Sequence, residues 1–386
     1  MTTKLKNYFP MIRSREEILK EIDDNIKLTE KFYSWGDSAR QEFLDFCTGV
    51  RGVKLLYDSF FKEIMNPETV PERLEDFLSV LLQKKVKIVE VLPGDSSRIA
   101  DEQSLLIMDI LVRFEDGTYC NVEVQKIGYA FPGERSACYS SDLLLRQYKT
   151  ARSRKKEKFT YKDVKGVYTI VLMDKSASIF DAFSEKYVHT FRQGSDTGLE
   201  MDLLQNYIFI PLDIFRENVH NKGIKNKLDA WLAFLSMDEP ERIIELITTY
   251  PEFKAMYEHV YSMCRNVEDA MGIFSEELKI LDRNTVRYMV DEMQDTINEQ
   301  KDIIKTLKTQ AKSDQGMIDT LKTQAESDKG MIDTLKTQAK SDRGMIETLK
   351  TQAESDKGMI ETLKTQAESD KNMIEELKRK IAELQK

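Results

Sequence analysis

The sequence predicts an α/β protein, and three observations lead to that prediction. Short apolar, β-prone runs alternate with segments whose large apolar residues recur at helical spacing. From about residue 57 these elements follow the order α-β-β-β-α-β. The chain of 386 residues then continues with a helical pattern and ends in a repeat with a heptad register. We therefore expect an α/β core, an appended helical region and a C-terminal coiled coil.

Taken in order, the elements divide the chain into four expected parts. Residues 1–56 have helical patterns, 57–213 hold the α/β core, 214–296 are helical, and 297–386 form the repetitive tail. Within the core, helical spacing covers 57–84 and 135–155. The strands are expected at 86–92, 105–112, 119–125, 166–173 and 207–212.

Two carboxylates interrupt neighbouring strands of this core. Asp109 lies inside the apolar run 105–112, and Glu123 lies between Val122 and Val124. The turn 115–117, Glu-Asp-Gly, joins the two runs as a hairpin and can bring the acids together. Burying a carboxylate is costly unless it is paired or binds a metal, and two carboxylates suit Mg²⁺. The alternative is that both are ordinary polar residues at strand ends.

Residues 58 to about 290 resemble the PD-(D/E)XK nuclease superfamily and, within it, the recombination-promoting nuclease and transposase family. The segments that carry the resemblance are 58–64 (DSFFKEI), 77–82 (FLSVLL), 108–110 (MDI), 121–126 (NVEVQK), 135–143 (RSACYSSDL), 189–191 (HTF) and 196–198 (DTG). The resemblance implies a restriction-endonuclease-like core and a Mg²⁺-dependent (or Mn²⁺-dependent) DNA endonuclease that supports recombination or transposition. It also implies that Asp109, Glu123 and the Val124 carbonyl ligate the metal, and that Asp109, Glu123 and Gln125 are catalytic.

Gln125 departs from the superfamily, which usually has lysine at this position, although this family commonly has glutamine. Glutamine can orient water or phosphate but cannot neutralise an oxyanion. Lys126 follows directly, but a regular strand would point it to the opposite face. The sequence therefore leaves an alternative open, a catalytically inactive DNA-binding or scaffolding protein that keeps the nuclease fold.

Further residues are candidates for supporting roles in catalysis. Glu75 lies on the helix before the sheet, where the superfamily sometimes supplies another acid; the alternative is a solvated helix residue. Gln147, on the helix after the core motif, resembles a polar residue often placed by the scissile phosphate, with a structural role as the alternative. Cys120 and Cys138 are expected to pack, and His189 is expected to be structural.

A basic stretch follows the proposed site. It contains Arg146, Lys149, Arg152, Arg154, Lys155, Lys156, Lys158, Lys162 and Lys165 against two acids, Glu157 and Asp163. Net charge is −9, so a nucleic-acid contact needs a local basic patch of this kind. We expect residues 146–158 to touch DNA phosphate; the alternative is a solvated surface.

The tail repeats Leu-Lys-Thr-Gln-Ala at 307, 321, 335, 349 and 363, a period of two heptads. Ile or Ala occupies every a position from 304 to 381, whereas Leu alternates with Asp at d over most of the tail. Glycines at 316, 330, 344 and 358 each cost about 1 kcal/mol of helix propensity. We expect a homo-oligomer, most simply a parallel dimer. The alternative is a flexible, partly helical arm.

Composition limits the remaining possibilities. Four widely spaced cysteines without a CxxC pair do not indicate a zinc knuckle or a disulfide framework. The N-terminus lacks a signal-peptide pattern, and no apolar span of about 18 residues suggests a membrane helix. We expect a cytoplasmic protein with DNA as its partner and no membrane association.

Overall fold

A computed structural model describes residues 3–93, 109–126 and 132–385, without the side chains at 282–288, 291, 292 and 295. The chain divides into two compact units, Met1–Gln294 and Asp295–Lys386. The strands are β1 Ile88–Val91, β2 Ile110–Phe114, β3 Tyr119–Gln125, β4 Val167–Met173, β5 His189–Phe191 and β6 Gln205–Pro211. The helices are α1 Arg15–Asp23, α2 Ile26–Tyr33, α3 Asp37–Cys47, α4 Asp58–Ile64, α5 Pro71–Leu82, α6 Pro132–Lys155, α7 Leu212–Lys222, α8 Lys227–Ser236, α9 Pro240–Thr249, α10 Glu252–Met263 and α11 Val267–Leu384. Short 3₁₀ turns cover Leu5–Asn7, Lys156–Lys158, Tyr161–Asp163 and Ser178–Phe183.

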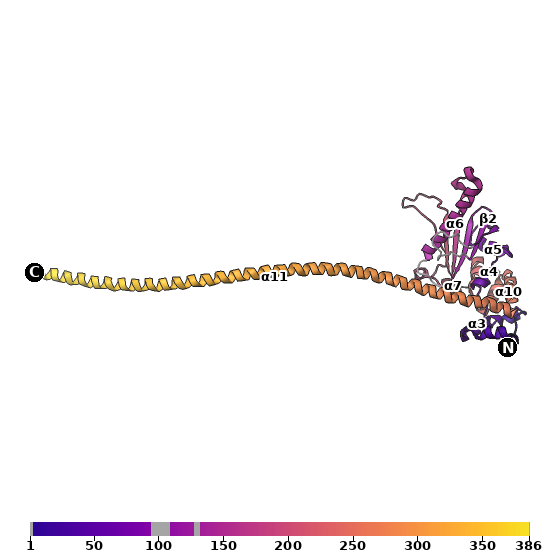
Figure 1. Cartoon of the computed structure of the whole chain (residues 1–386), viewed down its shortest axis with the longest axis horizontal. Helices are drawn as coiled ribbons and strands as arrows, with labels where there is room; N and C mark the ends of the chain where they lie inside the picture. The colour runs from indigo at the N-terminus through magenta and orange to yellow at the C-terminus, as the bar shows by residue number, and fades with distance from the viewer. Residues whose placement is uncertain (1–2, 94–108, 127–131, 386) are drawn as a thin grey trace. The chain divides into compact units, whose positions relative to one another are not determined.

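The central sheet is mixed and has the strand order β1-β2-β3-β4-β6-β5. Strands β1, β2 and β3 are antiparallel neighbours, whereas β3, β4 and β6 run parallel. The parallel pair β3–β4 needs a crossover, and α6 provides it. These features confirm the predicted α/β class, with the helices and strands forming layers (Figure 1).

Most predicted strands are found where the sequence pattern placed them. The runs 86–92, 119–125 and 166–173 contain β1, β3 and β4, and the run 207–212 overlaps β6, which begins two residues earlier. In the run 105–112, residues 105–108 lie outside the described residues, and β2 begins at Ile110, so Asp109 immediately precedes the strand. The edge strand β5 was not predicted, because its three residues, His-Thr-Phe, are too few to show a period.

A hairpin at Gly117 aligns β2 with β3. Gly117 has φ of +87°, a conformation that strains any residue with a Cβ. Its N–H donates to the Phe114 carbonyl at 3.0 Å, and the Phe114 N–H donates to the Thr118 carbonyl at 2.8 Å. A Cβ at Gly117 would also lie 3.0 Å from Cγ of Lys165. The turn therefore sets the β2–β3 register, in which Ile110 pairs with Val122.

The two faces of the sheet have different partners. On one face, even-numbered strand residues join the main core with the helices: Ile110, Val112, Val122, Ile170, Leu172 and Ile210. On the other face, Leu111 and Val167 pack against Tyr139 and Leu143 of α6. Because side chains alternate along a strand, Glu123 and Gln125 project towards the α6 face and Lys126 towards the other.

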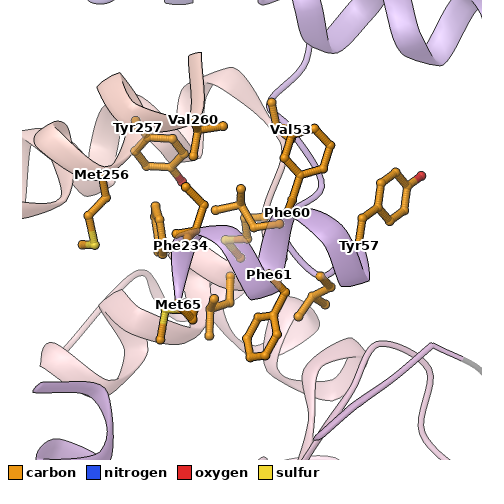
Figure 2. Close-up of a cluster of buried hydrophobic side chains, with 14 of the residues drawn as sticks. Val53, Tyr57, Phe60, Phe61, Met65, Phe234, Met256, Tyr257 and Val260 are labelled. Atoms are coloured by element: carbon orange, nitrogen blue, oxygen red, sulfur yellow. The ribbon is translucent and has the colours of Figure 1, made fainter. Parts of the chain in front are cut away.

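Helix α4 is held by a dense aromatic cluster, which Figure 2 shows. Phe60 and Phe61 of α4 are fully buried, as are Phe234 of α8 and Tyr257 of α10. The rings of Phe234 and Tyr257 meet edge-on at 5.0 Å. Each buried side chain of this size contributes roughly 1.5–3 kcal/mol. This packing holds α4 in one position and so places the two charged residues of the helix, Asp58 and Lys62.

Helix α11 contributes to the first unit only through its beginning. Val267, Ala270, Met271 and Phe274 are buried there. From residue 296 onward, every described side chain is exposed, including the isoleucines and leucines of the a and d positions. The tail is helical, and its pairing as a coiled coil stays a prediction. Among the described helices, none is long and apolar enough to cross a membrane.

Candidate active site

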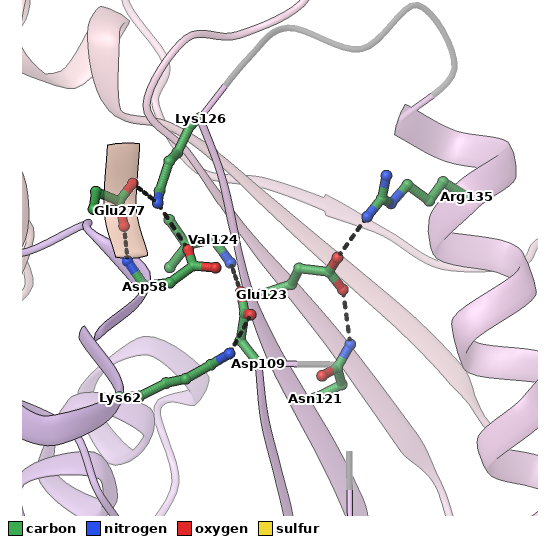
Figure 3. Close-up of polar contacts among 9 residues, drawn as sticks. All are labelled: Asp58, Lys62, Asp109, Asn121, Glu123, Val124, Lys126, Arg135 and Glu277. Atoms are coloured by element: carbon green, nitrogen blue, oxygen red, sulfur yellow. Dashed lines mark hydrogen bonds and ion pairs between the residues drawn. The ribbon is translucent and has the colours of Figure 1, made fainter. Parts of the chain in front are cut away.

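The two predicted carboxylates lie at the same end of β2 and β3 (Figure 3). The pairing of Ile110 with Val122 brings Asp109 opposite Glu123 when the register is continued by one residue. The Val124 N–H donates to Oδ2 of Asp109 at 2.8 Å, and Nζ of Lys62 lies 3.3 Å from Oδ1. Because the N–H and C=O of one strand residue point the same way, the Val124 carbonyl faces the Asp109 side. The hairpin thus brings Asp109 to the Val124 main chain and places Glu123 opposite it in the register, while the Glu123 carboxylate turns towards Arg135 of α6.

Glu123 lies in a largely desolvated position between the sheet and α6. Arg135 of α6 donates to its carboxylate at 3.2 Å, and the Asn121 amide donates at 3.4 Å. Burial raises the pKa of Glu123 to about 7. The positive charge of Arg135 lowers this pKa, whereas the negative charge of Asp109 raises it. The nearby Tyr139 hydroxyl acts to lower the same pKa. A carboxyl group with this pKa can exchange a proton near neutral pH.

Asp109 is similarly perturbed. Burial raises its pKa, and the nearby charge of Asp58 raises it further, while Lys62 acts in the opposite direction. Perturbed carboxyl groups that influence one another are typical of functional sites. The electrostatic contacts also place Asp58 close to the pair that the sequence motif identifies.

Gln125 is buried and has an unsatisfied donor. Among the described residues, no group accepts a hydrogen bond from its Nε2. Its backbone carbonyl accepts from the Asp174 N–H at 2.8 Å, so the main chain is fixed while the buried amide nitrogen stays unpaired. An unpartnered buried amide costs about 1–3 kcal/mol, and a bound water or phosphate oxygen would recover that cost.

Lys126 faces away from Gln125 and contacts a different set of residues. Its ammonium lies 2.9 Å from the Asp58 carboxylate and also pairs with Glu277 of α11. The Tyr57 ring lies 5.6 Å away. Glu277 is fully buried, burial raises its pKa, and it accepts a hydrogen bond from the Asp58 N–H at 2.9 Å. The side chain that could replace the usual lysine is therefore held on the opposite face of the strand.

Sequence reasoning missed several residues of this site. Asp58 and Lys62 lie in the segment 58–64 that carries the family resemblance, and their i, i+4 spacing on α4 places both on one helix face. Arg135 lies in the family segment 135–143, one turn before Tyr139 on α6. No local signal marks Glu277, because its partner is 151 positions away.

Two supporting candidates are not brought to the site, which corrects the expectation for both. Glu75 accepts a hydrogen bond from the Ile88 N–H at 2.8 Å and pairs with Lys87, so it stabilises the start of β1. Ile88 pairs with Phe114 at the end of β2 that is farther from Asp109. Gln147 uses both ends of its amide on the Lys165 backbone, at 2.9 and 3.2 Å. It lies twelve residues beyond Arg135, or about 18 Å along α6.

The predicted DNA-contacting residues occupy the far part of α6 and the turn after it. Arg146 is half-buried and pairs with Asp142 at 2.7 Å, whereas the other six are exposed. Lys155 pairs with Asp163 at 2.5 Å, and Arg152 donates to the Tyr148 hydroxyl. This surface therefore carries six exposed cations, of which Arg152 and Lys155 also contact neighbouring side chains.

Other packing expectations had mixed outcomes. Cys120 is buried in β3 as expected, whereas Cys138 is exposed on α6, so the expectation that it packs was wrong. Residues two positions apart point to nearly opposite sides of a helix, so Cys138 lies on the side of α6 opposite the buried Ser136 and Ser140. His189 packs between the rings of Phe180 and Phe183, at 5.1 and 5.8 Å, which agrees with a structural role.

The donor set suits a hard divalent cation. Within the described residues, no group of three or more His, Cys, Asp or Glu side chains is arranged to hold a metal. The available donors are the carboxylates of Asp109 and Glu123 and the Val124 carbonyl. Mg²⁺ commonly binds through one or two carboxylates and keeps several waters, so this set fits it. Lys62 and Arg135 now contact the carboxylate oxygens that such an ion would use.

Fold and site together define a class, an α/β protein with a nuclease-like pair of acids at the end of a β-hairpin. A family model described as PD-(D/E)XK nuclease family transposase matches residues 55–290. The chain belongs to this family. No curated protein matches it significantly, and no solved structure does either.

Proposed function

We propose that the protein is a Mg²⁺-dependent or Mn²⁺-dependent DNA endonuclease that supports recombination or transposition. The observation that carries the proposal is that Asp109 and Glu123 lie opposite each other in the register at one end of the hairpin, both with raised pKa. Their desolvation makes two neighbouring negative charges unfavourable without a cation. Family membership gives the nuclease fold, and the paired acids supply the chemistry that a hydrolase of this kind needs.

Each residue has a proposed task. Asp109, Glu123 and the Val124 carbonyl would hold the ion. A bound Mg²⁺ or Mn²⁺ would lower the pKa of a water molecule and neutralise charge on the leaving phosphate. The free amide of Gln125 would orient the attacking water or a phosphate oxygen. Lys62 and Arg135 supply the positive charge that Gln125 lacks, because they reach the carboxylates from α4 and α6.

The tail and the basic surface are proposed to serve the same activity. The exposed cations of residues 146–158 would bind DNA phosphate without sequence preference. The apolar stripe of the tail would pair two chains, since a lone helix leaves its isoleucines and leucines exposed. A dimer would carry two nuclease units, which suits cleavage of both strands of a duplex.

A second candidate function has its own supporting observation. Both carboxylates already have cationic partners, Lys62 and Arg135. If these pairs persist in the presence of metal, the protein would be an inactive DNA-binding or scaffolding protein with a nuclease fold.

Calorimetric titration with Mg²⁺ and Mn²⁺ separates the two candidates. The nuclease predicts saturable heat that Asp109→Asn and Glu123→Gln abolish, together with metal-dependent nicking of plasmid DNA. Exposed Glu115→Gln, in the hairpin turn, is the matched control and should leave both signals intact. DNA binding by folded protein without metal affinity or nicking would favour the scaffold.

A further inference from the structure

A group of three aromatic rings, of which Tyr161 is exposed and two are half-buried, lies among the basic residues at the far end of α6. Tyr148 of α6 packs with Phe159 and Tyr161 from the turn that follows the helix. The rings of Tyr148 and Tyr161 are nearly parallel, at 14° with centroids 6.2 Å apart. Phe159 meets them edge-on at 5.4 and 5.6 Å. We call these three residues the aromatic platform.

The outer ring of the platform faces solvent. Tyr161 is 79% exposed even though its ring lies nearly parallel to that of Tyr148, so most of the ring surface is open to solvent in the part of the chain that the structure describes. An aromatic side chain this exposed contributes little to the core. The position of Tyr161 is therefore better explained by a ligand than by stability.

The turn holds Tyr161 in place before any ligand arrives. Thr160 and Asp163 form a capping box around it, and Asp163 also pairs with Lys155. The Lys165 ammonium donates to the Lys162 carbonyl at 3.0 Å. A preorganised ring loses little conformational entropy when it binds.

The positive charge around the platform indicates which class of ligand it binds. The Arg152 guanidinium lies 5.6 Å from the Tyr148 ring centre, and Lys149, Lys156 and Lys162 are exposed nearby in the sequence. Residues 146–165 contain nine cations and two acids in a chain with net charge −9. Interleaved cations and open aromatic rings are the composition with which proteins bind single-stranded nucleic acid, because every base has a face that can stack.

We propose that the aromatic platform stacks an unpaired base of DNA, so that the substrate is a duplex with a single-stranded extension. The inference rests on the proposed DNA-cleaving function and names its substrate class. Tyr148 lies thirteen residues beyond Arg135, or about 20 Å along α6. That span equals about six base pairs of duplex, at 3.4 Å per pair. The junction between duplex and single strand would lie about that far from the cleavage site.

Binding measurements in EDTA test the platform without cleavage. The probes are a blunt duplex, the same duplex with a single-stranded extension carrying 2-aminopurine, and the single strand alone. The wild type should bind the extended duplex more tightly than the blunt one and quench the 2-aminopurine fluorescence by stacking. Tyr161→Leu should weaken binding to the extended duplex roughly 5- to 150-fold and abolish quenching. It should leave the blunt duplex unaffected.

Tyr161→Phe is the matched control, because it keeps the ring and should retain both affinity and quenching. Lys162→Gln should weaken binding to all three probes in the same proportion. Thermal melting checks folding, and the exposure of Tyr161 predicts an unchanged melting temperature. Equal affinity of the wild type and Tyr161→Leu for the extended duplex would overturn the inference, as would tighter binding to a matched RNA strand.

The inference and the proposed function can fail separately. Tyr161-dependent binding of extended DNA without metal-dependent nicking would keep the platform and reject the nuclease. Nicking that is indifferent to Tyr161 on both blunt and extended duplexes would keep the nuclease and reject the platform.

Discussion

Lys126 and Glu277 lie 151 positions apart in the chain, yet the Lys126 ammonium donates a hydrogen bond to the Glu277 carboxylate inside the protein. Lys126 directly follows the catalytic candidate Gln125, and Glu277 lies near the start of α11. The Asp58 carboxylate completes the contact at 2.9 Å from Lys126. The pair therefore ties the end of β3 to α4 and α11, and we expect it to act as a positioning contact for the site.

Removing one partner of this buried pair should be costly. Glu277→Gln removes one of the two carboxylate charges that face Lys126 and leaves that of Asp58, and we expect a loss of about 3 kcal/mol in the free energy of unfolding. The neighbouring Glu276→Gln is the control; Glu276 is exposed, so its change should stay within about 0.5 kcal/mol. The double variant Lys126→Met/Glu277→Leu should recover stability and retain nicking. Urea unfolding and a nicking assay measure the two effects, and loss of nicking in a stable double variant would assign Lys126 a part in the chemistry.

Stability should depend on pH through Glu123. Burial raises its pKa from an ordinary value of 4.5 to about 7, so the folded state keeps a proton that the unfolded chain loses in that window. The free energy of unfolding should therefore fall as pH rises from about 4.5 to about 7, by at most about 3 kcal/mol. Glu123→Gln mimics the protonated form and should lose this decline. In EDTA the variant should equal the wild type near pH 4.5 and exceed it at pH 8; a constant difference would contradict the assignment.

The basic surface should determine the salt dependence of DNA binding. Changing Lys155, Lys156 and Lys158 to Ala should weaken binding to unrelated sequences and reduce the slope of log K against log salt by up to about 0.9 per lysine. Because Lys155 also pairs with Asp163, its share should be the smallest. A charge-matched control changes the exposed Lys20, Lys27 and Lys186, and its slope should equal that of the wild type. An unchanged slope in the first variant would make those lysines a solvated surface.

The tail should drive self-association. Sedimentation of the full chain should show a dimer at micromolar concentration, and a 1–296 truncation should run as a monomer. Asp328→Leu with Asp342→Leu removes facing carboxylates from two d positions and should tighten the assembly. Asp333 is exposed and lies outside the a and d positions, so Asp333→Leu is the control and should leave the strength of the association unchanged. Monomers for both the full chain and the truncation would refute the coiled coil, whereas identical oligomers would place the association in residues 1–296.

Local chemistry explains which parts of the site were predictable from sequence. Asp109 and Glu123 were found because a hairpin signal at Gly117 fixes the spacing between two strands, and alternation gives the face of each side chain. Asp58 and Lys62 were not assigned because the place of α4 depends on Phe60 and Phe61 packing against distant helices, as Figure 2 shows.

The wrong assignments have a similar origin. Glu75 and Gln147 were selected by residue type and by position in the element order, which carry no information about which end of the sheet a helix residue reaches. Each accepts a hydrogen bond from a main-chain N–H at the end of the sheet away from Asp109 and Glu123. Glu75 accepts from Ile88, and Gln147 accepts from Lys165. Contacts of that kind join elements that are not adjacent in the chain, so no local period reveals them.

Nicking of supercoiled plasmid by the full chain is the most direct test of the central claim, that Asp109 and Glu123 form a metal-dependent centre. Wild-type protein and Glu115→Gln should nick with Mg²⁺ or Mn²⁺ and stop in EDTA. Asp109→Ala and Glu123→Ala should be reduced at least about a hundredfold while keeping their fold and DNA affinity. Equal nicking by the wild type and both alanine variants, or no nicking by folded wild type with either metal, would contradict the account.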